Sequence, residues 1–119
     1  KSGAYLIIQP TEALTVIDVN SGKNTSGKNA EEYYYKINLE AAAEISRQLR
    51  LRNISGIVIV DFINMAKEEQ RKELMHQFRL SLKEDPVPVR LVDITKLGLV
   101  ELTRKKERKT LLEQVAQLR

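Results

Sequence analysis

The sequence of 119 residues contains no cysteine and no tryptophan, a single histidine and only three prolines. The absence of cysteine excludes a disulfide framework, a thiol nucleophile and a cysteine-ligated zinc site within this stretch. The one histidine, His76, falls off the apolar line of its predicted helix, so we expect a surface side chain and no serine–histidine chemistry. The longest purely apolar run, residues 57–60, is far shorter than a membrane span.

Two features of the chain ends bear on its origin. No secretory signal peptide is recognisable, so the expected compartment is the cytoplasm. The sequence begins at Lys1 rather than Met, from which we expect a piece excised from a longer protein.

The composition is that of an ordinary globular protein, with 42% hydrophobic and 30% charged residues, and the length predicts one domain over residues 1–119. The formal net charge is +4. All of this excess lies after residue 95, because residues 96–119 hold seven basic and three acidic side chains. A basic end of this kind suits a polyanionic partner, although a solvated helix face explains it equally simply.

The apolar pattern predicts an α/β fold with the order β-β-α-β-α-β-α. Its mixed sheet is expected to begin with an antiparallel hairpin and to continue through right-handed crossovers. The run GIVIVDF lacks alternation, which is typical of a strand covered on both faces. The predicted elements are strands at 4–9 and 13–20, a helix at 38–52, a strand at 56–62, a helix at 66–83, a strand at 89–94 and a long C-terminal helix from residue 96.

That last predicted helix has no apolar residue between Thr103 and Thr110. A helix without an apolar face is hard to hold on a domain surface. We therefore expect residues 105–119 to project as a helical tail, or to dock on a second copy of the chain or on a further domain.

Two acids follow apolar strands whose carboxyl ends are expected to meet at one edge of the sheet. Asp18 lies near the end of the second strand and Asp61 at the end of the third, and Asn20 shares the face of Asp18. Two close carboxylates repel unless a cation separates them, and oxygen ligands favour Mg²⁺. The simpler alternative is that both acids cap loops where strands end. Asp93, which also ends a strand, is a candidate third ligand.

Two further patterns have alternative interpretations. Residues 22–28 fit the phosphate-binding pattern G-x-x-x-x-G-K, which would suit a nucleotide hydrolase, but Asn29 stands where Ser or Thr should bind Mg²⁺. The three tyrosines at 33–35 would suit base stacking, although we favour inward packing of one or two rings.

Five ordered blocks resemble the ribonuclease E/G family over nearly the whole chain. They are TEALTVIDVNSG (11–22), NLEAA (38–42), RQLRLR (47–52), GIVIVDFINM (56–65) and KLGLVELTR (96–104). The resemblance implies the DNase I-like catalytic subdomain of a larger bacterial endoribonuclease. That family cleaves single-stranded RNA, often in A/U-rich regions, in ribosomal and transfer RNA processing and in mRNA decay, and leaves 5′-phosphate and 3′-hydroxyl ends.

The resemblance also implies roles for individual residues. Asp18 and Asp61 would hold Mg²⁺, and Asn20 would support them. Basic side chains in the matching blocks and the loop are expected to hold RNA phosphates: Lys23, Lys28, Arg47, Arg50, Arg52, Lys96 and Arg104. Asn64 stands where the family often has a second acid, which puts a role for that position in doubt.

The family's RNA-binding barrel, 5′-end sensor and zinc-binding cysteine pair are not in this stretch. The expected partners are therefore RNA, further domains of a parent enzyme and a second copy of the chain through the C-terminal helix. Two alternatives stay open besides the endoribonuclease: an RNA-binding or assembly fragment inactive alone, and a nucleotide hydrolase using residues 22–28.

Overall fold

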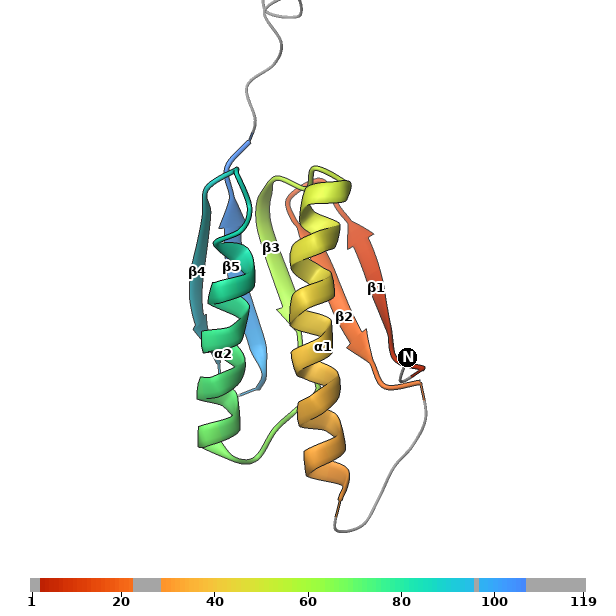
Figure 1. Cartoon of the computed structure of the whole chain (residues 1–119). Helices are drawn as coiled ribbons and strands as arrows, with labels where there is room; N and C mark the ends of the chain where they lie inside the picture. Colours follow the sequence, from red (N-terminus) through yellow and green to blue (C-terminus); the bar gives the residue numbers. More distant parts are fainter. Residues whose placement is uncertain (1–2, 23–28, 96, 107–119) are drawn as a thin grey trace, which may run out of the picture.

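A mixed five-stranded sheet carries two helices on one of its faces (Figure 1). The computed structural model describes residues 3–22, 29–95 and 97–106. The elements are β1 (Tyr5–Pro10), β2 (Thr15–Asn20), α1 (Ala30–Leu51), β3 (Gly56–Asp61), α2 (Glu68–Leu82), β4 (Val89–Ile94) and β5 (Leu99–Arg104). Neither helix is long and apolar enough to cross a membrane.

The sheet has the strand order β1-β2-β3-β5-β4. β1 and β2 pair antiparallel, which confirms the predicted hairpin. α1 connects β2 to β3, and these two strands pair parallel, as expected for a crossover through a helix. α2 leads from β3 to β4, which runs parallel to β3 but is separated from it by β5, antiparallel to both.

The predicted C-terminal helix is wrong, because Leu99–Arg104 forms the strand β5 and the element order is β-β-α-β-α-β-β. Burial along β5 alternates, with Val100, Leu102 and Arg104 buried and the residues between them exposed. This period of two is that of a strand with one covered face, so the strand needs only two apolar side chains to be anchored. The lack of apolar residues after Leu102, which argued for a projecting helix, therefore does not prevent β5 from packing on the core.

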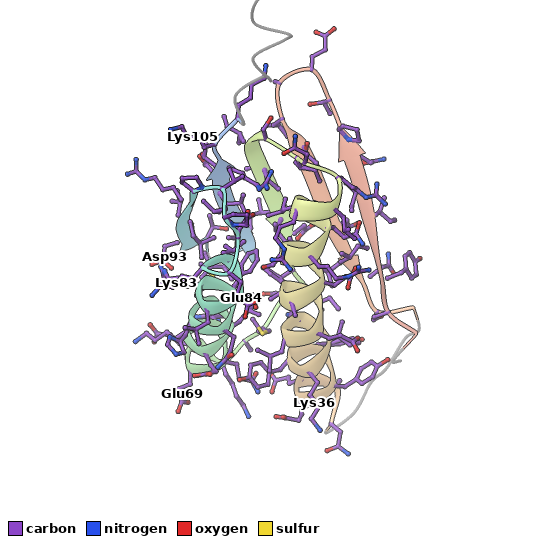
Figure 2. All side chains as sticks on the ribbon, turned by 45° about the horizontal axis from the view of Figure 1, so that its top comes forward. Lys36, Glu69, Lys83, Glu84, Asp93 and Lys105 are labelled. Carbon is purple, nitrogen blue, oxygen red and sulfur yellow. The ribbon has the colours of Figure 1, made fainter. Side chains whose placement is uncertain are left out.

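The chain beyond β5 is described only as far as residue 106. The backbone N–H of Lys105, labelled in Figure 2, donates to the carbonyl of Pro88 at 3.0 Å, so Lys105 continues the antiparallel pairing with β4. Lys105 is therefore not part of a helix, and the helical tail stays a prediction for residues 107–119, which lie outside the described residues.

The core lies between the sheet and the two helices. α1 begins at Ala30, eight residues before the predicted start, and its stripe of Ile37, Ala41, Ile45 and Leu49 is buried as the spacing predicts. The three tyrosines lie inside this helix, half-buried and packed against the core, which favours the inward interpretation. α2 contributes Phe78, whose ring meets that of Phe62 edge-on at a centroid distance of 5.6 Å.

Neither α1 nor α2 covers the second face of the sheet, which is called the open face below (Figure 1). Alternate residues of each strand point to it, among them apolar side chains as exposed as Ile57 (41%) and Val92 (44%). The expectation that β3 is covered on both faces is therefore wrong for this chain. By the alternation of burial, the open face of the four strands nearest the acids consists of Tyr5, Ile7, Gln9, Val16, Asp18, Asn20, Ile57, Ile59, Asp61, Leu99, Glu101 and Thr103.

Candidate functional site

Asp18 and Asp61 are direct neighbours on the two parallel strands. Their Cα atoms are partners in the β2–β3 register, which places them about 4.8 Å apart. Both side chains alternate with buried apolar neighbours and so share the open face. The prediction that the two acids emerge together at the carboxyl ends of these strands is confirmed.

The proximity of the acids has an electrostatic consequence. Burial raises the pKa of Asp61 above its ordinary value of 3.8, and the negative charge of Asp18 raises it further. A like-charged pair of this kind costs free energy at neutral pH unless a cation lies between the carboxylates.

Asn20 follows Asp18 on the same face, and its turn is tightly packed. Its Oδ1 lies 3.5 Å from the backbone nitrogen of Gly22. Gly22 has a φ of +80°, and a Cβ there would overlap the carbonyl oxygen of Gly3. Only glycine fits this position, which fixes the course of the chain directly after Asn20.

The segment after Asp61 is held by side chains from both helices. Asn38 of α1 is fully buried, and its amide donates to the carbonyl of Ile63 at 2.8 Å and accepts from the Ile63 N–H at 3.0 Å. Arg71 of α2 donates to the carbonyls of Met65 and Ala66 at 2.6 and 3.0 Å. The strand end that carries Asp61 therefore enters a connection in which the Ile63 N–H and the carbonyls of Ile63, Met65 and Ala66 are hydrogen-bonded, which favours a fixed carboxylate position.

Replacing Asn38 with Ala is expected to lower the free energy of unfolding by about 2 kcal/mol, because two backbone groups of Ile63 lose their partners. Urea unfolding measures the loss. Ser46→Ala is the matched control, because Ser46 is also buried on α1 but bonds only to Ala42 of its own helix. Equal losses in the two variants would show that Asn38 does not brace the connection.

Of the cations predicted to hold RNA phosphates, those that the structure describes do not surround the acids. α1 runs antiparallel to β2 and β3, so Arg47, Arg50 and Arg52 lie at the opposite end of the sheet (Figure 1). Arg47 is exposed and paired with Glu44 at 3.2 Å, and Arg52 donates to Gln48 at 2.8 Å. Lys23, Lys28 and Lys96, together with most of the candidate phosphate loop, lie outside the described residues.

Arg104 has a structural environment and no open path to a phosphate. It is 2% exposed, and its guanidinium bonds Asp85 at 2.8 and 3.2 Å, the side chain of Asn53 at 3.0 Å and the carbonyl of Ile54 at 3.1 Å. Burial would raise the pKa of Asp85, but hydrogen bonds from Arg104 and the Val87 N–H and the charges of Arg104 and Arg50 outweigh it, so the pKa is lowered. Arg104 thus joins β5 to two connections: the one before β4, through Asp85, and the one before β3, through Asn53 and Ile54.

The remaining candidates lie apart from the acid pair. Asp93 is on β4, at the sheet edge opposite β1 and two strands from Asp61, where it accepts from the Ile94 N–H (Figure 2). His76 is exposed on α2, as expected. Asn64 is exposed in the connection after β3. Among the described residues, no group of three or more His, Cys, Asp or Glu is placed to hold a metal ion.

Sequence reasoning left two residues near the acids without a role. Asn38 carried a signal, because it adjoins the apolar stripe of α1 and a polar residue there must find a buried partner. Tyr5 carried none, because the segment YLIIQP lacks the alternation that would assign its side chains to faces. Only the pairing with β2 reveals that Tyr5 lies opposite Asn20.

Known proteins are similar to nearly the whole of this sequence. The sequence pattern of the Ribonuclease E/G family matches residues 1–107. Ribonuclease E of Synechocystis sp. is 49% identical over 116 residues, which are 98% of this chain and 17% of that protein. Ribonuclease E of Nostoc sp. is 49% identical over 112 residues, 94% of this chain and 16% of that protein.

A protein named ribonuclease G is also similar to this chain. Ribonuclease G of Escherichia coli (strain K12) is 43% identical over 111 residues, which are 93% of this chain and 23% of that protein. The chain thus spans less than a quarter of the length of these relatives.

Proposed function

The chain belongs to the Ribonuclease E/G family, and from this premise we propose that its acid pair is the Mg²⁺-binding centre of an endoribonuclease that cleaves single-stranded RNA. The observation that supports the proposal most strongly is the in-register pairing of Asp18 with Asp61 on an exposed sheet face. Buried structural acids do not need such an arrangement, because each would find its own donor.

The residues at this edge fit a magnesium ion. Mg²⁺ in proteins is commonly held by one or two carboxylates, with waters and substrate phosphate oxygens completing six ligands. Asp18 and Asp61 supply the carboxylates, and Asn20, two residues after Asp18 on β2, lies on the same face. Burial raises the pKa of Asp61, and the nearby negative charge of Asp18 raises it further, which a cation between the two carboxylates would offset.

The chain's own groups have simple roles in the proposed reaction. Asp18 and Asp61 act as fixed anionic ligands, and Asn20 orients the groups beside them. When bound, Mg²⁺ lowers the pKa of a water molecule and neutralises charge that builds up at the phosphorus. Attack of water on phosphorus with departure of the 3′ oxygen, which takes up a proton, leaves 5′-phosphate and 3′-hydroxyl ends.

The wider assignments are also proposals. They are an action on ribosomal and transfer RNA precursors and on mRNA, an association with further domains, and a cytoplasmic location in a bacterium. Lys23, Lys28, Lys96, Arg47, Arg50 and Arg52 stay candidates for phosphate contacts, the three arginines only for RNA that extends about 15–20 Å from the acids along the sheet.

The test is incubation of the 119-residue chain with a 5′-monophosphorylated, A/U-rich single-stranded RNA, with Mg²⁺ or with a chelator. We expect cleavage only with Mg²⁺, and products whose upstream fragments end in a 3′-hydroxyl. Binding of RNA without cleavage under either condition would favour the alternative of an RNA-binding fragment that is inactive alone.

A further inference from the structure

Two exposed apolar side chains lie on the edge strand beside the acid pair. Tyr5 is 52% exposed and Ile7 is 38% exposed, and both lie on the open face of β1. Their register partners on β2 are Asn20 and Asp18, respectively. Cross-strand partners on one face lie about 5 Å apart, so the tyrosine ring flanks Asn20 and lies diagonal to Asp18.

The fold does not use these two side chains for its core. The other residues of β1, Leu6 and Ile8, pack against the core from the covered face. A half-exposed aromatic ring on an edge strand gains little for stability, and apolar edge strands favour unwanted pairing with other chains. A role on the surface explains Tyr5 better than a role in folding.

The charges around the acids point to the kind of contact that this surface makes. Among the described residues, the open-face neighbours of the acid pair are neutral or acidic, Glu101 included, and none is a lysine or arginine. On this part of the described face, the contacts open to nucleotides next to the phosphate at the acids are therefore uncharged ones. Aromatic rings supply such contacts to any base, because every base has a π face.

We propose that Tyr5, with Ile7 beside it, is a stacking platform for one nucleobase next to the phosphate held at Asp18 and Asp61. The inference rests on the proposed function, because it places RNA at the acid pair. The platform supplies affinity with little base preference, and it fixes which nucleotide of a flexible single strand lies over the acids. Tyr5 is thus a positioning residue.

The experiment uses the 119-residue chain and short single-stranded RNAs that carry one 2-aminopurine, moved along the strand. Ca²⁺ replaces Mg²⁺, since it takes the same oxygen ligands. Stacking on an aromatic ring changes the fluorescence of the base, and anisotropy of an end label gives the dissociation constant. Tyr5→Thr removes the ring and keeps a β-branched side chain suited to a strand, whereas Tyr5→Phe keeps the ring. Leu80→Ala, a similarly exposed apolar residue on α2, is the control.

We expect quenching at one position of the strand with the parent chain. Tyr5→Thr should lose this quenching and bind about tenfold more weakly, while Tyr5→Phe and Leu80→Ala behave like the parent. Unchanged quenching and affinity in Tyr5→Thr would overturn the platform, as would a loss in Tyr5→Phe, which would assign the contact to the hydroxyl group. No RNA binding by the parent, or capture of a protein segment in its place, would overturn it as well.

The outcome for the platform is separate from that for the proposed function. If the parent and Tyr5→Thr cleave RNA equally well in Mg²⁺, the proposed nuclease function is supported and the platform is not. Ring-dependent quenching without cleavage would support the platform and favour an RNA-binding fragment that is inactive alone.

Discussion

Replacing Asp61 with Asn is expected to make the chain more stable in metal-free buffer and to abolish its response to Mg²⁺. In the parent, burial and the charge of Asp18 oppose ionisation of Asp61, and the neutral amide removes both costs. The same change removes a ligand whose cation supplies several kcal/mol to the transition state, so cleavage should fall on the order of 10³-fold or more. Thermal unfolding with and without Mg²⁺ measures the first effect, and single-turnover cleavage measures the second.

The pH dependence of this stabilisation has a definite sign. The folded-state pKa of Asp61 is raised, so the folded protein holds its proton more tightly than the unfolded chain does. The cost to the parent is therefore absent well below pH 3.8 and fully present above the raised pKa. The gain of stability in Asp61→Asn should appear at neutral pH and vanish in acid.

Asp93→Asn is the matched control, because it makes the same chemical change at an exposed strand end two strands away. Saturating Mg²⁺ should raise the unfolding temperature of the parent and of Asp93→Asn but not of Asp61→Asn. At a Mg²⁺ concentration of 100 times the dissociation constant, the free energy of unfolding rises by about 2.7 kcal/mol. An equal response to Mg²⁺ in all three proteins would remove Asp61 from the metal site.

Replacing Arg104 with Ala is expected to lower the free energy of unfolding by about 3–5 kcal/mol. The change leaves the buried carboxylate of Asp85 without its partner and frees the side chain of Asn53 and the carbonyl of Ile54. Domains of this size are stable by only about 5–15 kcal/mol, so the loss is a large part of the total. Urea unfolding monitored by circular dichroism measures it.

Two comparisons separate this structural role from a phosphate contact. Arg47→Ala removes an exposed arginine whose pair with Glu44 should contribute at most about 0.5 kcal/mol. The pKa of Asp85 is lowered, so the stability that its pair contributes is present above pH 3.8 and lost as the pH falls through the lowered pKa. The difference in stability between the parent and Arg104→Ala should therefore shrink in acid, and the part due to Asn53 and Ile54 should remain. The Arg104→Ala variant can be kept folded at low temperature. If it then binds RNA more weakly than the parent, the result supports the phosphate contact that the family resemblance implies for Arg104.

The parts of the fold predictable from sequence are those that depend on neighbours along the chain. The hairpin, the stripe on α1 and the strand ending in Asp61 each show in a local apolar pattern, and the rule for parallel strands then brings Asp18 and Asp61 to one edge. β5 was missed because its third inward residue is Arg104, which hides the period of two. Arg104 can be buried only because it pairs with Asp85, which lies 19 residues away in the sequence.

The positions of the charged residues were predictable in part. A helix that joins two parallel strands must return against them, so Arg47, Arg50 and Arg52 had to lie at the end away from the acids. The resemblance carried no such geometry, and it grouped these cations with the acids. The platform residue Tyr5 could not be placed from sequence, because the register of β1 depends on a turn and a partner strand rather than on its own pattern.

The register between β2 and β3 also limits how the sequence can change in length. Because side chains alternate along a strand, one residue inserted into β2 before Asp18 would turn that carboxylate toward the helices and leave Asp61 alone on the open face. An insertion in the connection that precedes α1 would change neither carboxylate. In a family with this architecture, tolerated insertions and deletions should therefore concentrate in the connections and avoid the strands from Thr15 to Asp18 and from Val58 to Asp61.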